Sequence, residues 1–198
     1  MLSEEGIQDN WFVFSRVVEE DVRLKSRKTW IYGERCNQFM YLLDFSAGNA
    51  PFPYGPPPGT RFEGTIVLYP GPTPQRGLIK TRNPELQTFG SISFATTLSR
   101  AFELYSDALL GNPWILAYPF LLKGVIPDYN NGQLSLFDEE RNSLPVSQPL
   151  TFSWPLLALS GGDPLIVFGE WVENSFLPRS VIWKDGFHNV TGNQEIAA

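Results

Sequence analysis

The sequence predicts an α+β fold of mostly antiparallel β-strands, arranged as sheets or partly open barrels, with one main amphipathic helix at about residues 93–110. The 198-residue chain is 42% hydrophobic and 14% aromatic, and its 17 glycines and 17 prolines indicate many turns. This mixture is typical of β-rich domains with short strands. Short apolar runs between turn residues recur along the chain, whereas only one segment has clear helical periodicity.

The predicted helix carries one apolar stripe with spacings of three and four residues. The stripe consists of Phe94, Leu98, Ala101, Phe102, Tyr105 and Leu109. Ser91 or Ser93 is expected to cap the first turn, because a serine oxygen accepts from its free amides. Gly111 suits the left-handed position that ends a helix. Asn112-Pro113-Trp114 would open a second, short helix that ends before Pro119.

Apolar, β-prone runs predict the strands on both sides of this helix. In the first half they are Trp11–Val18, Thr29–Tyr32, Phe39–Phe45, Phe62–Tyr69 and a strand that begins at Leu78. In the second half they are Phe120–Ile126, Leu134–Phe137, Phe152–Leu159, Leu165–Trp171, Phe176–Trp183 and Phe187–Val190. The prolines from Pro51 to Pro58 cannot donate to a ladder, so the chain must leave the sheet there. Asn131-Gly132 predicts a tight turn within the connection Pro127–Gln133.

The domain organisation follows from these elements. We expect flexible tails at residues 1–10 and 191–198 and one globular β-rich domain at 11–190. The alternative is two β subdomains, at about 11–88 and 119–190, that are joined by a helical segment at 91–118.

Charge and composition exclude several classes of function. A net charge of −6 argues against general affinity for nucleic acid or anionic lipid. The longest apolar segment, Trp114–Leu122, contains Pro119 and is shorter than the ~20 residues of a spanning helix. We therefore expect a cytoplasmic protein without a membrane partner. A single cysteine, Cys36, and a single histidine, His188, leave no ligand set for a zinc site, which needs about four ligands. No metal or cofactor is expected.

Two carboxylates are candidates for a pocket. Glu34 and Glu170 each follow a glycine at the end of a predicted strand. Paired carboxylates perform acid–base chemistry when they lie close together and one of them is desolvated. The alternative is that each accepts hydrogen bonds from backbone amides at a turn. Ser160-Gly161-Gly162 is interpreted as a hairpin connection, because a phosphate loop would precede a helix and carry a lysine.

Three basic residues are candidates for an interaction surface. Arg76, Lys80 and Arg82 share a parity, so an extended strand would place them on one face. With Tyr69 nearby they could contact phosphates or an acidic partner. The alternative is an edge strand whose charges prevent aggregation.

Several motifs together carry a resemblance to a known family. They are Trp30-Ile31-Tyr32-Gly33-Glu34, Leu43-Asp44-Phe45, Pro58-Gly59-Thr60, Tyr69-Pro70-Gly71 with Pro74, Arg76-Gly77-Leu78-Ile79, Asn112-Pro113-Trp114, Leu156-Leu157-Ala158-Leu159-Ser160-Gly161-Gly162 and Phe168-Gly169-Glu170-Trp171. In order and spacing they resemble the region C-terminal to the zinc finger of bacterial SWIM zinc-finger family proteins. The resemblance covers roughly residues 28–186.

The resemblance implies an accessory domain. The Cys-x-Cys … Cys-x-His site that gives the family its name has no counterpart here, so no metal ligand is transferred. The region has no catalytic residues to transfer either. We expect a non-catalytic interaction domain that binds a protein partner or the missing zinc-finger region. The alternatives are an enzyme or small-ligand domain that uses Glu34, Glu170 or Asp44, and a weak nucleic-acid-binding module.

Overall fold

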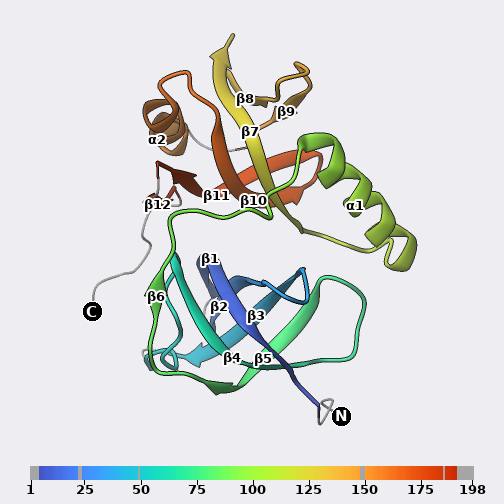
Figure 1. Cartoon of the computed structure of the whole chain (residues 1–198), viewed down its shortest axis with the longest axis vertical. Helices are drawn as coiled ribbons and strands as arrows, with labels where there is room; N and C mark the ends of the chain where they lie inside the picture. The colour runs from blue at the N-terminus through green and yellow to red at the C-terminus, as the bar shows by residue number, and fades with distance from the viewer. Residues whose placement is uncertain (1–4, 22–23, 49, 148–149, 185, 191–198) are drawn as a thin grey trace. The chain divides into compact units, whose positions relative to one another are not determined.

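The computed structural model describes residues 5–21, 24–48, 50–147, 150–184 and 186–190. The chain forms two compact units, a first that ends at Phe89 and a second that begins at Gly90 (Figure 1). Each unit contains a six-stranded sheet, and both α-helices belong to the second unit. The protein is therefore β-rich and α+β, as predicted, but its described residues form two helices where the sequence indicated one main helix.

The first unit contains six strands. They are β1 (Ile7–Asp21), β2 (Leu24–Gly33), β3 (Gln38–Ala47), β4 (Thr60–Leu68), β5 (Gln75–Arg82) and β6 (Gln87–Thr88). The prediction of a flexible tail over residues 1–10 is wrong from Ile7 onward. Residues 7–12 pair antiparallel with residues 61–66 of β4, so this segment is held by a complete strand ladder.

The strands of the first unit pair in the order β1-β2-β3-β5-β4-β6, and β1 also pairs with β4. Strands β1 to β5 therefore form a closed ring of pairings. Strand β1 is long enough to serve both neighbours, and its register with β2 shifts between Val13 and Ser15. Strands β3 and β5 are parallel, whereas the other pairs are antiparallel. The ring encloses a buried cluster of Trp11, Val13, Ile31, Met40, Leu42, Phe62 and Ile66.

Arginines hold the proline-rich connection between β3 and β4. Arg16 donates from Nη2 to the carbonyl oxygens of Gly55 (2.8 Å) and Pro56 (2.6 Å). Arg27 donates to the carbonyl oxygen of Pro53 (2.6 Å), and its guanidinium lies 4.9 Å from the ring centre of Phe52. Proline has no amide donor but keeps its carbonyl acceptor, so cationic side chains can bind this segment where a ladder cannot.

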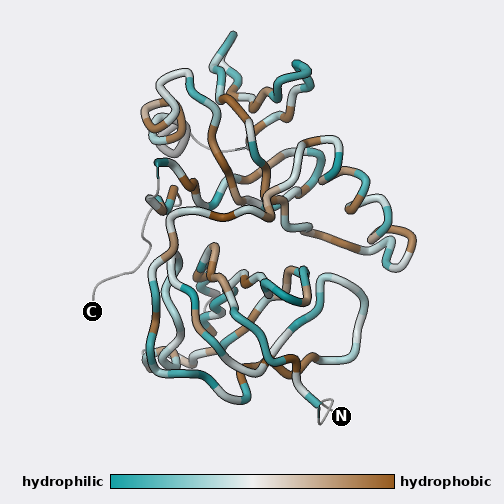
Figure 2. The backbone as a smooth tube through the Cα atoms, viewed as in Figure 1, coloured by the Kyte–Doolittle hydropathy of each residue, from teal (hydrophilic) through white to brown (hydrophobic). Residues whose placement is uncertain are grey.

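The second unit contains two helices and six strands. They are α1 (Leu98–Gly111), β7 (Tyr118–Asn130), β8 (Gln133–Phe137), β9 (Ser143–Pro145), α2 (Leu150–Ser160), β10 (Leu165–Val172), β11 (Ser175–Trp183) and β12 (Gly186–Asn189). The antiparallel strand order is β12-β11-β10-β7-β8-β9. Apolar residues of β7 and β10, which appear brown in Figure 2, contribute to one buried cluster with both helices. No helix in the described part of the chain is long and apolar enough to cross a membrane.

Helix α1 is capped by Thr97, four residues after Ser93, the later of the two predicted caps. Thr96 makes a β-bridge to Leu122, with its amide donating to the carbonyl of Leu121 (2.9 Å) and its carbonyl accepting from the amide of Lys123 (2.8 Å). This bridge keeps the backbone extended up to Thr97, whose side chain accepts from the amide of Arg100 (3.3 Å) and caps the helix. Ser91 and Ser93 therefore lie outside the helix.

The other end of α1 also differs from the prediction. Gly111 is the last helical residue, and the following Asn112 donates its amide to the carbonyl of Ala108 (2.9 Å). Pro113 and Trp114 form a turn and not the start of a second helix. Helix α1 lies within the second unit, whereas the two-subdomain alternative had placed it in a joining segment.

Replacing Thr97 by alanine is expected to destabilise the second unit by about 1 kcal/mol, because the amide of Arg100 loses its acceptor. The alanine variants of Ser91 and Ser93 should stay within about 0.5 kcal/mol of the parent protein. Urea unfolding of the three variants, followed by far-UV circular dichroism, measures the difference. An equal loss for Thr97→Ala and Ser93→Ala would contradict the observed helix start.

The predicted strand Phe152–Leu159 is wrong, because this segment is helix α2. A short, uniformly apolar run does not distinguish a buried helix from a buried strand. The structure buries Leu156 and Ser160, which lie four residues apart as one helical face requires, and it leaves Trp154 and Ala158 exposed. Packing of Leu156 into the cluster of the second unit thus favours the helix.

The Asn131-Gly132 turn is confirmed, but its flanks are longer than predicted. Both residues have positive φ, 49° and 83°, and they join β7 directly to β8. Pro127, expected in a loop, lies in β7 opposite Leu136. Strand β7 pairs with β10 only as far as Val125, so the missing proline amide interrupts no ladder on that side.

Candidate functional site

The carboxylates that the sequence singled out have separate partners. Glu34 lies exposed after β2, where its side chain accepts from Nδ2 of Asn10 (3.0 Å). Asp44 accepts from Nε (3.0 Å) and Nη2 (2.6 Å) of Arg27, an inward-facing residue of β2. Both contacts join neighbouring parts of the first unit. Acid–base chemistry by paired carboxylates needs two acids side by side, and in these contacts neither Glu34 nor Asp44 lies against a second acid.

Glu170 belongs to the second unit and is buried. Only 3% of its surface is exposed, on β10 beside β11. One carboxylate oxygen accepts from both Nε (2.7 Å) and Nη2 (2.6 Å) of Arg179. In a buried ion pair of this kind, the attraction between the two charges offsets the cost of removing them from water. Glu34 and Glu170 therefore lie in different units, each with its own partner.

Asp9 is a fully buried carboxylate that the sequence prediction missed. It accepts from the backbone amides of Asn10 (2.7 Å), Arg35 (3.0 Å) and Cys36 (2.8 Å). Burial by itself would raise its pKa, but the hydrogen bonds from Cys36, Arg35 and Asn10 outweigh burial, and the pKa is lowered from its usual 3.8. The sequence does contain one signal for this burial. Asp9 lies two residues from Ile7 and two from Trp11, so on a strand it shares their inward face.

The groups around Asp9 are poor acids. Burial, followed by the hydrogen bond and the negative charge of Asp9, raises the pKa of the Cys36 thiol to about 11. Burial also raises the pKa of Tyr32 to about 12, and its hydroxyl is hydrogen-bonded to Oδ1 of Asn37. Gly33 completes the turn, since a Cβ there would lie 2.9 Å from Oδ2 of Asp9 and 2.4 Å from Sγ of Cys36. Asp9 thus organises the β2–β3 turn, and the thiol beside it is not a ready nucleophile.

The Ser160–Pro164 segment connects α2 to β10 and does not join two strands as predicted. The hydroxyl of Ser160 donates to the carbonyl of Asp163 (2.6 Å), and it accepts from the amide of Gly162 (3.1 Å). Gly161 and Gly162 have positive φ, 55° and 96°, as required to leave the helix. The buried hydroxyl is therefore used by its own turn.

The three basic candidates on β5 do not share one face. The register with β4 pairs Ile79 with Ile66 and Thr81 with Thr65, so Lys80 is the extra residue of a β-bulge. Arg82 is opposite Gly64, on the side of the buried cluster, and its guanidinium lies 5.1 Å from the ring centre of Tyr54.

Arg76 lies on the opposite, outer face of the ring of strands. It pairs with Tyr41 of β3, and its Nη2 donates to the carbonyl of Leu43 (3.1 Å). Its guanidinium carbon lies 4.6 Å from the ring centre of Tyr69 and 5.8 Å from that of Phe45. Such positions favour cation–π attraction. Arg76 therefore joins two aromatic residues of the outer face.

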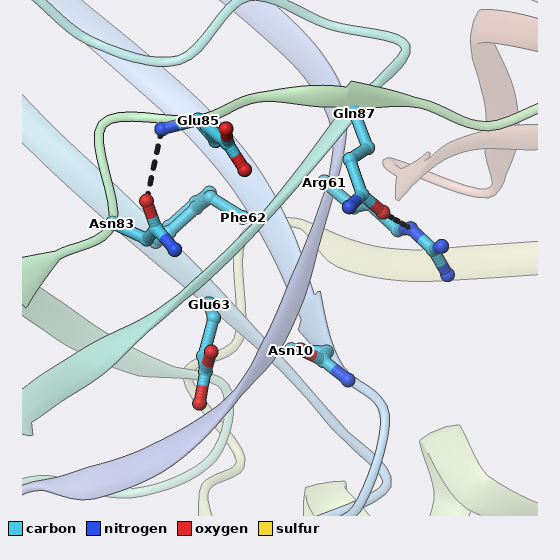
Figure 3. Close-up of a pocket in the computed structure, with 7 residues that line it drawn as sticks. All are labelled: Asn10, Arg61, Phe62, Glu63, Asn83, Glu85 and Gln87. Carbon is cyan, nitrogen blue, oxygen red and sulfur yellow. Dashed lines mark hydrogen bonds between the residues drawn. The ribbon is translucent and has the colours of Figure 1, made fainter.

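One pocket of the first unit is small and open (Figure 3). Its volume is about 160 Å³, below the about 300–1,000 Å³ of typical ligand sites. Its lining residues are Asn10, Arg61, Phe62, Glu63, Asn83, Glu85 and Gln87. Arg61 donates to the side chain of Gln87 (3.0 Å) and Asn83 accepts from the amide of Glu85 (3.0 Å), so part of this polar lining is already paired.

The most exposed large apolar side chains among the described residues lie in the last turn of α1 and in the segment after it. Leu110, Trp114 and Leu116 are 87%, 85% and 87% exposed; we call these three residues the apolar tip. The amide of Asn112 caps α1, and its side chain accepts from the amide of Trp114 (3.2 Å). These hydrogen bonds order the turn between Leu110 and Trp114, while the large side chains of the tip face solvent.

In the part of the chain that the structure describes, no group of three or more histidine, cysteine or acidic residues is placed to hold a metal ion. Neither a family model, a curated protein nor a solved structure matches this chain. The relationship to SWIM zinc-finger proteins stays a prediction.

Proposed function

We propose that this chain is a non-catalytic binding protein of the cytoplasm that contacts a protein partner through the apolar tip. The observation that carries this proposal is the exposure of Leu110, Trp114 and Leu116 within seven residues. Exposed clusters of large apolar residues mark interaction sites, and tryptophan is enriched among the residues that dominate binding energy. The resemblance to SWIM zinc-finger proteins implies that a domain with this binding role is an accessory domain.

The chemistry around the tip favours a protein over an anionic membrane. No lysine or arginine lies between Arg100 and Lys123 in the sequence, so the segment that carries the tip has no cation of its own to attract acidic lipids. The hydrogen bonds of Asn112 with Ala108 and Trp114 order the turn before binding. An ordered turn loses less conformational entropy when a partner binds.

The contacts of the carboxylates support the non-catalytic part of the proposal. Glu170 is paired with Arg179, and Asp44 is paired with Arg27. Asp9 is engaged by backbone amides, and the Cys36 thiol has a raised pKa. Each of these groups has a local role in the fold, so a catalytic role is not needed to explain its position.

We also propose that the ring of β1 to β5 is a partly open barrel. Its strand order, in which β1 pairs with β4 and β3 runs parallel to β5, corresponds to that of OB-fold barrels. Such barrels present strands 2 and 3 to elongated ligands. In this chain the proline-rich connection would close one end of the barrel.

A pull-down from extract of the source organism tests the tip. The bait carrying Trp114→Ser and Leu116→Ser is expected to lose a partner that the parent bait retains. Because both side chains are more than four-fifths exposed, this variant should keep its free energy of unfolding within about 0.5 kcal/mol.

The matched control is Tyr54→Ser, since Tyr54 is an aromatic residue that is also mostly exposed but lies in the first unit. It should retain the same partner as the parent. The proposal fails if the parent retains no specific partner, or if the double variant retains the same partner at equal stoichiometry.

A further inference from the structure

Strand β3 has one side without a strand partner along part of its length. It pairs with β5 only through Met40–Leu42 and Gln75–Gly77. Beyond Gly77, β5 continues along β4 and bulges at Lys80. Residues 43–47 of β3 therefore have β2 on one side and, in the described chain, no strand on the other. We call residues 43–47 the open edge.

The backbone of the open edge points away from β2 at alternate residues. The carbonyl of Leu43 accepts from the guanidinium of Arg76, a β5 residue, so it faces the β5 side. Backbone groups two residues apart along a strand point the same way. The amide and carbonyl of Phe45 therefore face the same side, where no strand pairs with them. Unpaired strand edges of this kind are templates for another extended chain.

Apolar side chains border the open edge on its outer face. Phe45 and Leu78 are 48% and 45% exposed. They share a face, because Tyr41 and Arg76 are opposite each other and both Phe45 and Leu78 lie an even number of residues from that pair. An added strand would place alternate side chains against this apolar pair.

A positive charge, that of Arg76 on β5, lies beside the open edge, whose own acid, Asp44, is paired with Arg27. Arg76 contacts Leu43, Phe45 and Tyr69, but it has no carboxylate partner among the described residues. Its buried Nε has no hydrogen-bond acceptor within the same described set. Lys80, at the bulge of the same strand, is exposed. A carboxylate on the bound segment would therefore meet an arginine that no acid of the described chain neutralises.

We propose that the open edge binds an extended acidic segment of a partner protein as an added β-strand. Its backbone pairs with the amide and carbonyl of Phe45, an apolar side chain covers Phe45 and Leu78, and a carboxylate approaches Arg76. The carbonyls of Leu43 and Ala47 on the same side already accept from Arg76 (3.1 Å) and from the amide of Ala50 (3.2 Å). This is a second binding site, in the first unit, and it does not depend on the apolar tip. Strand addition obtains affinity from main-chain hydrogen bonds and specificity from the pockets for alternate side chains.

The charge balance favours a peptide over a nucleic acid. Residues 1–89 contain ten of the 15 basic and ten of the 21 acidic residues, so their net charge is zero and the −6 belongs to the rest of the chain. Nucleic-acid affinity depends on neutralising several phosphates. Aromatic residues beside an arginine can nevertheless stack on bases, so an oligonucleotide is the competing occupant to test.

The probe is a phage-displayed library of random twelve-residue peptides, selected on the full chain. We expect enriched peptides to alternate apolar residues and to carry at least one carboxylate. Synthetic copies should bind the parent protein at least about tenfold more tightly than Phe45→Asp or Leu78→Asp, a loss that corresponds to ~1.4 kcal/mol. Circular dichroism checks that both variants fold. If one variant does not fold, the other still tests the proposal.

Methylation of the peptide backbone tests the added strand directly. N-methyl groups on one set of alternate residues should abolish binding, whereas those on the other set should leave it unchanged, because only alternate amides face β3. On binding, the amide of Phe45 should become protected from hydrogen exchange, having exchanged faster than that of Asp44 in the free protein.

Three results would overturn this proposal. The first is a set of peptides that bind the parent and both Asp variants equally, and the second is a methylation effect that does not alternate along the peptide. The third is salt-sensitive binding of a fifteen-nucleotide thymidine oligomer that changes the hydrogen exchange of the Phe45 amide while no peptide does. The tip variant Trp114→Ser, Leu116→Ser should bind the peptides like the parent. Failure of the tip proposal and failure of this one are thus measured separately.

Discussion

Replacing Asp9 by alanine is expected to destabilise the first unit by about 3 kcal/mol or more. The change removes an ionised acceptor and leaves the backbone amides of Asn10, Arg35 and Cys36 without their partner. Each hydrogen bond to a charged group contributes about 1.5–3 kcal/mol, although the three are not additive. Urea unfolding, followed by the fluorescence of the buried Trp11 nearby, measures the loss.

The pH dependence provides an independent check on Asp9. Its pKa is lower in the folded chain than the usual 3.8, so the unfolded chain binds more protons between the two values. The stabilisation by Asp9 is therefore complete above pH 3.8 and is lost as the pH falls through the folded pKa. Asp9→Asn should lack this component of acid destabilisation.

Glu34→Gln is the matched control, because Glu34 is exposed and makes a side-chain contact to Asn10 in the same turn. It should change the free energy of unfolding by less than about 0.5 kcal/mol. Equal losses for the Asp9 and Glu34 variants, or an unchanged acid transition in Asp9→Asn, would show that Asp9 does not organise this turn.

Replacing Glu170 by glutamine is expected to destabilise the second unit by about 3–5 kcal/mol. The substitution leaves the mostly buried guanidinium of Arg179 without a counter-charge, and breaking one partner of a buried ion pair has an effect of this size. Chemical denaturation of Glu170→Gln measures it. Glu173→Gln, a change at an exposed carboxylate three residues away, should have little effect.

This result also discriminates between a structural and a catalytic Glu170. A carboxylate kept for chemistry is often strained, and its removal tends to raise stability. A carboxylate kept for its ion pair must lower stability when removed, and replacing both partners by apolar residues should then cost less than the sum of the single changes. Unchanged or increased stability in Glu170→Gln would restore the alternative of a pocket carboxylate.

The candidate site was only partly predictable from sequence. Arg76 was identified as a candidate interaction residue from its parity, but the bulge at Lys80 separates it from Arg82, and a bulge has no reliable sequence signal here. Trp114 and Leu116 read as ordinary apolar residues, because hydrophobicity indicates a tendency to be buried and does not show which residues find a partner surface.

Local chemistry by itself determined the β-rich α+β class, most of the strand positions, the Asn131-Gly132 turn and the amphipathic stripe of α1, since each depends on the spacing or backbone preference of nearby residues. Only the tertiary structure decided the helical state of α2, the start of α1 at Thr97, the ordering of the chain from Ile7 and the burial of Asp9. These features depend on residues far apart in the chain: Leu156 packs into a distant cluster, Thr96 is bridged to Leu122, and Asp9 accepts amides 26 and 27 residues away.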